Sequence, residues 1–433
     1  MSRSLPPLVR RLAALVMMSM ALSPAHAGVR TVTNLDVVNR DGRSFITWDN
    51  LPGGCWTYHV YIKRGAFEPT REFLDDTDIN ELGAVRDSSA VDRRISALLH
   101  RTLTYSIDGA GTPLPASRGL FVVPTDQDWG YYSYAVMAES LSCGACFLRV
   151  PGQNMTAQPI IEHSGLRRPI FQRHLTSPVK GDDYVLFISN IDVQGFPAMT
   201  NQGYLGTHVG VIPGKPSGAL LVTGHGRGGS FLNALASSGV AGEWVMAIDD
   251  YLPTQDVADF YFGYHGDYDF SKPWNVQPSL YTYVSNYSEM RVMYLLDWAD
   301  SDLPHDHSRV YALGSSMGGT FAFSMAWHHS DRIAASMSFI PRLCFGTSDT
   351  PSWLAETSDR LWGTADENLP TTFGTGAYEW LDGPTQADKK RETGSSPIIG
   401  FFGRNDDMVG WKDKVDYLRV AEEARSGGTW YWD

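Results

Sequence analysis

Hydrophobic and polar residues follow two different periods along the chain. Between residues 28 and 145, apolar and polar positions alternate, and turn clusters such as Pro52-Gly53-Gly54 interrupt the alternation. From residue 181 onward, short continuous apolar runs alternate with stretches whose apolar residues recur at helical spacing. The first pattern predicts an all-β sandwich. The second predicts an α/β domain with a mostly parallel sheet and helices on both faces.

The strands expected in the sandwich are short and end at turn residues. They span residues 31–37, 44–48, 57–62, 119–123 and 132–137. The segment 68–104 is more polar and tolerates helix, so it predicts an insertion into the sandwich. Residues 146–180 contain scattered Gly and Pro and predict an irregular connector.

The strands expected in the second half are buried runs of Val, Ile, Leu, Ala and Phe. They span residues 184–188, 203–212, 219–223, 243–248, 309–313, 334–340, 397–402 and 429–432. One helix is expected at 286–298, where Asn286 as N-cap and Glu289 three residues later form a capping-box pattern. Another helix is expected at 411–425.

The first 27 residues have the composition of an export signal. Arg3, Arg10 and Arg11 precede an apolar run at 12–22, and Ala25-His26-Ala27 has the form of a cleavage site. We therefore expect a signal peptide at 1–27 and a secreted or periplasmic protein. A membrane anchor is the alternative, which the shortness of the run disfavours.

The net charge of −13 argues against some classes of binding partner and substrate. Basic clusters are absent after the leader, so nucleic-acid binding is not expected. Acidity of this size favours solubility and disfavours polyanionic substrates. No later apolar run suggests a membrane span.

Four cysteines allow several arrangements. In an exported protein, Cys143 and Cys146 could close a small disulfide loop, and free thiols are the alternative. A redox pair would need a thioredoxin-like context, and a zinc site would need a second pair of ligands nearby. The pairing of Cys55 with Cys344 cannot be decided from sequence.

The segment Gly314-Ser315-Ser316-Met317-Gly318 lies between an expected strand and an expected helix. Small residues on both sides suit a sharp strand-to-helix turn that exposes a nucleophilic serine. The helix N-terminus directs free N–H groups and a partial positive charge toward an oxyanion formed there. Ser316 is therefore the candidate nucleophile, and an ordinary tight turn is the alternative interpretation.

This segment, with Asp306 and Arg309 before it, resembles the nucleophile elbow of the α/β-hydrolase superfamily in its secreted esterase and depolymerase-like branches. The resemblance covers residues 181–433. It implies that the aromatic-rich insert 344–394 forms a cap over the site, and a packed surface excursion is the alternative. It also implies catalytic residues in the order Ser, Asp or Glu, His.

The resemblance assigns the remaining site residues except one. Gly403, Asp406 and Val409 keep the family's Gly-x-x-Asp-x-x-Val spacing, which makes Asp406 the expected triad acid and Asp407 the alternative.

The oxyanion hole is expected to use the N–H groups of Met317 and Gly226. The loop 225–229, which contains Gly226, resembles the His-Gly-Gly segment of esterases. A plain glycine turn is the alternative, and phosphate binding is disfavoured because no Lys-Ser/Thr follows.

The general base has no candidate in the expected place. The family carries this histidine on the loop after the last strand, but none of the twelve histidines follows Asp406. We therefore expect the sequence to be truncated within its C-terminal strand. His225 is expected to be structural in the oxyanion loop, and His265 lies in an aromatic loop that could approach the site. The pairs at 305/307 and 328/329 are expected to lie away from it.

Residues 28–145 resemble a fibronectin type III domain. The resemblance rests on Trp48 in an early strand, on Tyr58-x-Val60-Tyr61, and on Tyr132-x-Tyr134-x-Val136. Such sandwiches act mostly as spacers or binding modules. We expect this one to hold the second domain near an extracellular polymer or surface.

No cofactor and no metal are expected. His305-Asp306-His307 and His328-His329 are local pairs without a further ligand set at zinc spacing. Acidic loops such as Asp249-Asp250 and 267–269 are too unspecific to assign calcium.

The favoured function is a secreted serine hydrolase that cleaves small or polymeric carboxylic esters through an acyl-enzyme on Ser316. A serine peptidase of the same fold is the close alternative. A non-catalytic binding or adhesion protein on a hydrolase scaffold is the alternative from another class, and the missing histidine supports it. The acyl and alcohol groups of the substrate cannot be decided from sequence.

Overall fold

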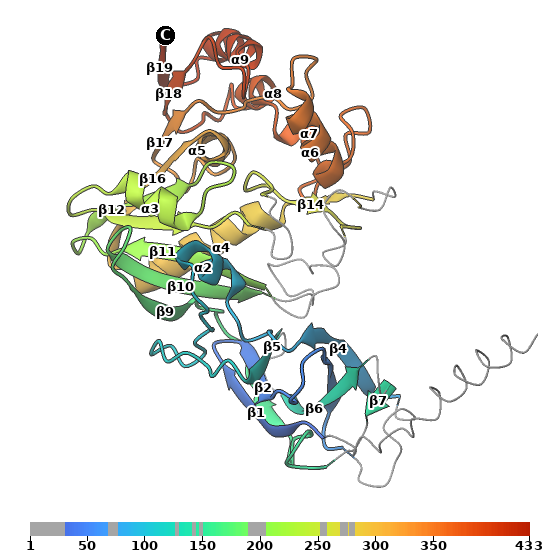
Figure 1. The fold of residues 1–433 in the computed structure, drawn as a ribbon. Helices are drawn as coiled ribbons and strands as arrows, with labels where there is room; N and C mark the ends of the chain where they lie inside the picture. Colours follow the sequence, from blue (N-terminus) through green and yellow to red (C-terminus); the bar gives the residue numbers. More distant parts are fainter. Residues whose placement is uncertain are drawn as a thin grey trace, which may run out of the picture.

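The computed structural model describes residues 31–67, 77–125, 130–140, 144–146, 150–188, 205–251, 258–268, 276 and 282–433. The expected signal peptide and Cys143 lie outside these residues, so the leader and the Cys143–Cys146 loop stay predictions. Two parts are stacked along the long axis of the molecule (Figure 1). A smaller all-β part lies at one end, and a larger α/β part carries the C-terminus at the other.

The smaller part consists of two antiparallel sheets packed face to face. One has the order β1-β2-β5 and the other the order β4-β3-β6-β7, with β8 also paired to β6. Trp48, Tyr58, Phe121 and Val136 fill the space between the sheets and are buried. The strands are β1 (Thr33–Arg40), β2 (Arg43–Asp49), β3 (Thr57–Arg64), β4 (Ile79–Arg86), β5 (Arg118–Pro124), β6 (Gly130–Ser140), β7 (Gly144–Cys146) and β8 (Ile160–Glu162).

The sandwich reaches beyond the segment from which it was predicted. Strand β8 lies inside the expected connector 146–180, yet it pairs with β6. The likeness to fibronectin type III stays a prediction.

Among the described cysteines outside β7, Cys55 is exposed, Cys344 is buried and both are free thiols.

The larger part is built on a nine-stranded mixed sheet with the order β19-β18-β17-β16-β12-β13-β11-β10-β9. Six strands of this sheet, β12, β13, β16, β17, β18 and β19, pair in parallel, as the continuous apolar runs predict. The three strands nearest the sandwich pair antiparallel. The strands are β9 (Ile170–Leu175), β10 (Gly181–Ile188), β11 (Leu205–Ile212), β12 (Gly218–Gly224), β13 (Trp244–Ile248), β16 (His305–Ser315), β17 (Ala335–Phe339), β18 (Ile398–Phe402) and β19 (Gly428–Trp432).

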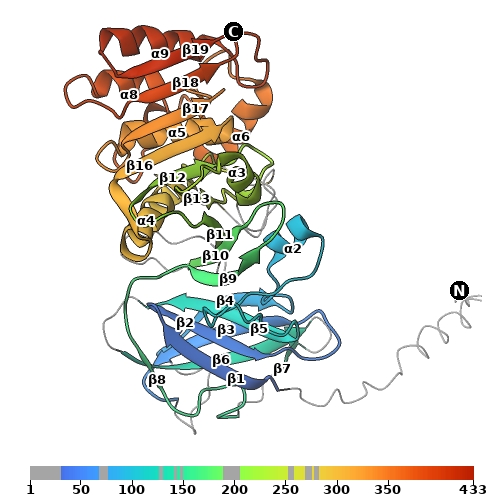
Figure 2. The same cartoon turned by 90° about the vertical axis from the view of Figure 1, so that its left-hand side faces the viewer.

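Helices cover both faces of this sheet (Figure 2). Helices α4 (Tyr287–Asp302) and α5 (Met317–His328) share a core with Leu220 and Val222 of β12. Helix α3 (Phe231–Ser238) packs on Val245 and Ala247 of β13, whose side chains alternate to the opposite face. Helix α9 (Lys412–Glu423) lies beside α5 and packs on β18 and β19. No helix in the described part of the chain is long and apolar enough to cross a membrane.

The expected capping box at the start of α4 does not form. Asn286 is the N-cap, but its side chain accepts no hydrogen bond from the helix backbone. The carboxylate of Glu289 is buried and instead binds His328 Nδ1 at 2.8 Å, His329 Nε2 at 2.9 Å and Trp380 Nε1 at 2.8 Å. Burial opposes ionisation of Glu289, but the two histidines outweigh it and hold its pKa far below the usual range.

The expected insert 344–394 contains three helices, α6 (Ser352–Trp362), α7 (Ala377–Trp380) and α8 (Gly383–Lys389). It packs on the hairpin of β14 (Tyr264–His265) and β15 (Val284–Ser285) and on the aromatic loop before it. Trp362 is fully buried and donates its Nε1–H to the carbonyl of Gly263 at 2.7 Å. Most aromatic residues of the insert therefore serve packing, while Phe373 is exposed.

The sandwich and the large sheet share a hydrophobic core. Phe45 and Val122 of the sandwich pack against Val185 and Phe187 of β10, and the rings of Phe45 and Phe187 meet edge to face at 5.6 Å. This core lies between sheet β1-β2-β5 and the antiparallel end of the nine-stranded sheet. The two parts therefore pack directly on one another.

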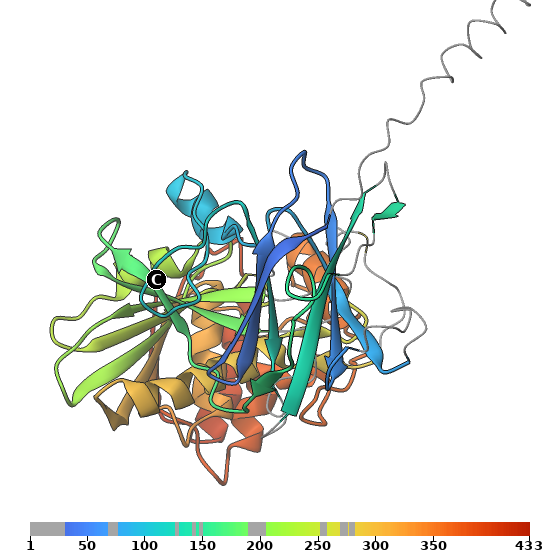
Figure 3. The same cartoon turned by 90° about the horizontal axis from the view of Figure 1, so that it is seen from below.

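A polar cluster adds to this interface. Between β4 and β5 the chain leaves the sandwich and forms α2 (Arg93–Leu99), which lies against the larger part, apart from the sandwich strands (Figure 3). Asp92, the N-cap of α2, meets the buried ring of His208 on β11 at 3.1 Å. His208 also contacts Asp183 at 2.7 Å, and Arg173 pairs with both carboxylates.

His208 is held as a cation in this cluster. Burial opposes protonation, but Asp183 and Asp92 outweigh it and raise the pKa of His208 to about 10. Because this pKa lies above the unfolded value of about 6.5, the stabilisation is complete below about pH 6.5. It is lost as the pH rises through about 10.

We expect His208→Gln to lower the free energy of unfolding by about 3–5 kcal/mol at pH 6, because one buried carboxylate loses its counter-charge. Urea unfolding between pH 6 and 10 measures this, and the deficit should shrink toward the alkaline end. His59→Gln is the matched control, since His59 lies between Glu81 and Glu139 on the surface. Its change should stay below about 1 kcal/mol, and an equal effect of both variants would contradict the assignment.

Candidate active site

Ser316 occupies a strained turn between β16 and α5. Its φ of 56° and ψ of −120° lie outside the regions that a non-glycine residue ordinarily adopts. The turn is held by the N–H of Ser316, which donates to Phe339 O at 2.8 Å, and by the N–H of Thr320, which donates to Ser316 O at 3.0 Å. Ser316 is half-buried, and Ser315 beside it is exposed.

The glycines around Ser316 are required by close backbone contacts. A methyl group on Gly318 would overlap the carbonyl oxygen of Gly224 at the end of β12. A methyl group on Gly314 would overlap the carbonyl oxygen of Gly318. The Gly-x-Ser-x-Gly pattern therefore lets α5 begin directly against two parallel strands.

Two backbone N–H groups lie beside Ser316. Met317 opens α5, and Gly226 lies so close that a Cβ on it would be 3.8 Å from the Cβ of Ser316. Neither N–H has a hydrogen-bond acceptor among the described residues. The structure thus brings together three of the four sequence-predicted site residues and leaves two donors available near the serine hydroxyl.

His225 fixes the backbone of the oxyanion loop and is buried. Its Nδ1 lies 2.8 Å from Gly226 O, and its Nε2 accepts a hydrogen bond from the N–H of Asp250 at 2.9 Å. Its own N–H donates to the hydroxyl of Tyr261 at 2.7 Å. Both ring nitrogens face the protein interior, so this ring positions the loop and is not aimed at Ser316.

The sequence analysis assigned no role to Tyr261, which belongs to the aromatic loop that also contains His265. The hydroxyl of Tyr261 donates to Ile248 O at 3.1 Å while accepting from His225, and its ring packs on Phe321 of α5 at 4.7 Å. Its φ of 58° is unusual for a tyrosine. The sequence signal was only the aromatic run 260–264, which does not distinguish packing from support of a loop.

Asp249 and Asp250 at the end of β13 serve the same loop. Asp249 accepts hydrogen bonds from Arg94 Nε at 2.7 Å and from the N–H of Phe231 at 3.0 Å. Burial opposes its ionisation, but the neighbouring ring of His225 and the guanidinium of Arg94 outweigh it and hold its pKa far below the usual range. Burial and the nearby Asp259 raise the pKa of Asp250 well above the usual range. These carboxyl groups are committed to protein partners.

Asp406 follows β18 on the same edge of the sheet as Ser316. Its Oδ1 accepts from the N–H groups of Met408 at 2.8 Å and Val409 at 3.1 Å, which fixes the side chain. Its Oδ2 accepts no hydrogen bond from the described residues. Asp407 is exposed, whereas Asp406 is half-buried. Strands β16 and β18 are separated by β17, so the ends of the two strands lie about 10 Å apart.

No described histidine ring bonds to Ser316. His265 is buried under the insert, where burial lowers its pKa to about 4. His305 and His307 lie at the opposite end of β16, and His328 and His329 are bound to Glu289. The described residues therefore include a candidate nucleophile, a candidate acid and candidate oxyanion donors, but no histidine in contact with Ser316.

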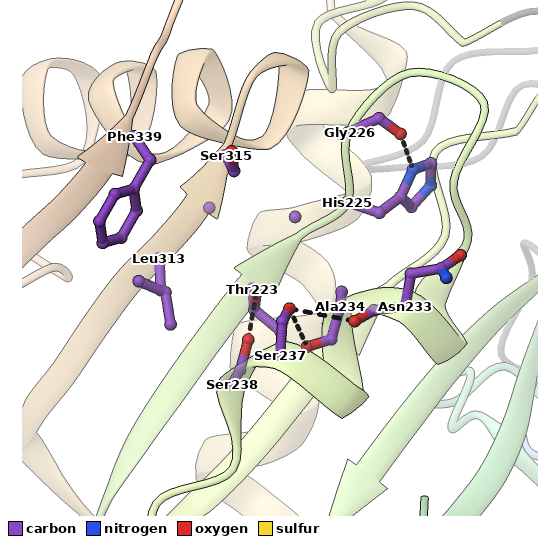
Figure 4. A pocket seen from close by; sticks show the side chains of 12 residues that line it. Thr223, His225, Gly226, Asn233, Ala234, Ser237, Ser238, Leu313, Ser315 and Phe339 are labelled. Atoms are coloured by element: carbon purple, nitrogen blue, oxygen red, sulfur yellow. Dashed lines mark hydrogen bonds between the residues drawn. The ribbon is translucent and has the colours of Figure 1, made fainter. Parts of the chain in front are cut away.

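A pocket of about 160 Å³ adjoins the elbow (Figure 4). Leu313, Ser315 and Phe339 line one wall, and α3 lines the other through Ala234 and Ser237. The pocket reaches the oxyanion loop at Gly226 but lies on the Ser315 side of the turn. It therefore borders the candidate site without containing the hydroxyl of Ser316.

The insert contacts the oxyanion loop from outside. The guanidinium of Arg227 lies 4.4 Å from the centre of the Trp353 ring on α6. Contacts of this kind stabilise by about 0.5–1 kcal/mol at exposed sites. The position of α6 beside this loop is what a cap over the site requires.

We expect Gly318→Ala to lower the free energy of unfolding by about 3 kcal/mol or more, because its methyl group must displace the backbone of Gly224. Gly226→Ala is the matched control near the same serine. Its methyl group would meet only Ser315 O at 3.6 Å and Ser316 Cβ at 3.8 Å, which are ordinary contacts. Chemical denaturation of both variants measures the difference, and equal stability of the two would show that the elbow is not packed in this way.

Comparison with known protein families gives a match over the part of the chain that holds the candidate site. Residues 220–428 match the sequence model of the Esterase family, described as putative esterase. No curated protein sequence matches the chain significantly.

The matches among solved structures include three proteins. An S-formylglutathione hydrolase from Agrobacterium tumefaciens is 15% identical, with 60% of this chain and 90% of that chain covered and a TM-score of 0.42. FphF, a fluorophosphonate-binding serine hydrolase from Staphylococcus aureus, is 13% identical, with 58% of this chain and 90% of that chain covered and a TM-score of 0.40. Esterase 2 from Thermogutta terrifontis is 16% identical, with 53% of this chain and 77% of that chain covered and a TM-score of 0.34.

TM-scores below 0.5 and identities of 13–16% show neither the fold nor the activity of this chain. The family match runs from β12 to β19 and includes the oxyanion loop, the elbow and Asp406. Residues 220–428 thus match a family of putative esterases, and this match supports an ester hydrolase.

Proposed function

We propose that this protein is a secreted serine hydrolase that cleaves carboxylic esters through an acyl-enzyme on Ser316. The observation that carries the proposal is the strained backbone of Ser316, with φ 56°, beside the N–H groups of Met317 and Gly226, which have no acceptor in the described part of the chain. Strain of this kind costs about 1–3 kcal/mol and persists where function requires it. The esterase match of residues 220–428 supports the same reaction class.

The proposed chemistry has two steps. The hydroxyl oxygen of Ser316 attacks the ester carbonyl carbon while a base takes its proton, and the alcohol leaves with that proton. Water then attacks the acyl-enzyme and releases the acid. In both steps the negative oxygen is held by the N–H groups of Met317 and Gly226, and one such donor contributes about 10²–10³ to kcat.

The base in this proposal is a histidine that Asp406 orients. Support comes from Asp406, whose Oδ1 is fixed by two N–H groups while its Oδ2 accepts no hydrogen bond from the described residues. This leaves Oδ2 available to accept the N–H of an imidazole ring. The proposal assigns this role to none of the described histidines, because none of their rings contacts Ser316.

Export and surface attachment belong to the same proposal. The leader at 1–27 would direct the protein out of the cytoplasm, and the fibronectin type III-like sandwich would hold the catalytic part near a polymer or a surface. The second candidate function is a non-catalytic binding protein on this scaffold. It is favoured by the lack of contact between Ser316 and any described histidine.

We expect Ser316→Ala to reduce hydrolysis of short p-nitrophenyl esters by about 10³-fold or more, because the acyl-enzyme cannot form. Ser315→Ala is the matched control, since Ser315 faces the pocket on the other side of the turn. A fluorophosphonate should label the wild type and the Ser315 variant and leave the Ser316 variant unlabelled.

Absence of labelling in a folded wild-type chain would favour the binding protein over the enzyme. Parallel assays with aminoacyl p-nitroanilides separate ester from amide cleavage. A higher kcat/KM on the amides would move the protein to the peptidase alternative.

We expect Asp406→Asn to lower kcat by about 10⁴-fold, because an amide would favour the wrong tautomer of the proposed base. Asp407→Asn should retain nearly full activity, since its side chain is exposed. Steady-state kinetics on the same ester measures both. If Asp407→Asn carried the larger loss, the acid would have to be reassigned to Asp407.

A further inference from the structure

A second cluster of polar side chains lies at the far end of β16 from Ser316. Asp300 comes from the last turn of α4, and His305 and His307 come from the first residues of β16. Their ligand atoms all lie within 4.8 Å of one another. Successive side chains of a strand alternate, so His305 and His307 project to the same side.

The ring of His305 is prepared as a metal ligand. Its Nδ1 lies 3.1 Å from Leu303 O, which fixes the proton on Nδ1 and leaves a lone pair on Nε2. The side chain is fully buried, and Nε2 forms no hydrogen bond among the described residues. Yet Nε2 lies only 3.1 Å from Oδ1 of Asp300. A second proton on the ring would make this contact an ion pair, and a metal ion in place of that proton would be bound by both atoms.

The carboxylate of Asp300 is oriented in the same way. Its Oδ2 accepts a hydrogen bond from Arg332 Nη2 at 2.8 Å, which leaves Oδ1 for another partner. Arg332 also binds Asp297 at 2.7 Å, so its positive charge is shared between two carboxylates. Such outer contacts set the direction of a ligand and tune its basicity.

We propose that Asp300, His305 and His307 bind a divalent transition-metal ion, Zn²⁺ by its ligand preference. Zn²⁺ takes imidazole nitrogen at about 2.0–2.1 Å and carboxylate oxygen at about 2.0–2.2 Å in a tetrahedron. Two such ligands lie about 3.3–3.5 Å apart, close to the 3.1 Å between His305 and Asp300. The exposed side chain of His307 can supply the third ligand, and water the fourth.

The proposed ion would link the end of α4 to the start of β16. The sequence pattern indicated His305 and His307 as a local pair of potential metal ligands. The fold adds Asp300 as a third, because the chain turns back at Leu303 and Pro304. Alkaline-earth ions fit poorly, because Mg²⁺ and Ca²⁺ prefer oxygen ligands. The role of this site is structural and does not depend on the proposed ester hydrolysis.

The test is a Zn²⁺ titration of the chelator-treated full-length protein without reductant, in competition with a chromophoric zinc indicator. We expect the wild type to bind one equivalent that His307→Ala and Asp300→Asn each weaken by about 100-fold or more. Both positions are exposed or half-buried, so the variants should fold. His174→Ala is the matched control, because exposed His174 contacts Asp182 at 2.6 Å.

Two further readouts decide the outcome. Zn²⁺ should raise the melting temperature of the wild type and the His174 variant but not that of the His307 variant. Bound Co²⁺ should show d–d bands without a thiolate charge-transfer band. The proposal is overturned if the wild type binds no equivalent, if His307→Ala binds as tightly as the wild type, or if a thiolate band places the ion at cysteines.

Discussion

The backbone of Ser316 is the constraint on which the catalytic half depends. A φ of 56° and a ψ of −120° are unfavourable for serine, so the surroundings must hold the turn in place. They do so by close packing: Gly318 at the start of α5 lies against the carbonyl of Gly224, and the N–H of Ser316 is bonded to Phe339. These contacts need the ends of β12, β16 and β17 to be level. The parallel register, which pairs Gly224 with Gly314 and Ser315 with Phe339, meets that need.

The sandwich takes part in holding the oxyanion loop. Helix α2, which comes from the sandwich segment, carries Arg94 to the end of β13, where it binds Asp249 at 2.7 Å and Gly229 O at 2.9 Å. Asp249 in turn lies 3.3 Å from His225, whose ring fixes Gly226. The sandwich is therefore more than a spacer, because separating it from the sheet would remove a support of the loop beside Ser316.

Sequence patterns predicted eight of the nine strands of the large sheet and missed β9, which lies inside the expected connector 146–180. They predicted the contacts between distant segments poorly. Buried runs such as 219–223 and 397–402 correspond to β12 and β18 within a residue at each end, since continuous apolar character leaves little choice. Polar segments carry no such signal. The segment 68–104 predicted only an insertion, and nothing in it indicated that Arg94 would reach Asp249. Likewise Glu289 suited a capping box, and only the fold shows that two histidines compete for its carboxylate.

Strand β16 connects the proposed metal site at His305 to the elbow at Ser316, but the two are too far apart for a strong electrostatic interaction. From His305 to Ser315 it spans ten residue steps, about 33 Å. The Debye length at physiological salt is about 8 Å, so an ion at His305 has little electrostatic effect on Ser316. What the strand can transmit is position, because β16 pairs with β12 at His305 and again over 310–314, and with β17 over 311–315, and α5 continues directly from its end. Fixing the start of β16 to α4 would thus act on the stability of the elbow and leave the electrostatic surroundings of Ser316 unchanged.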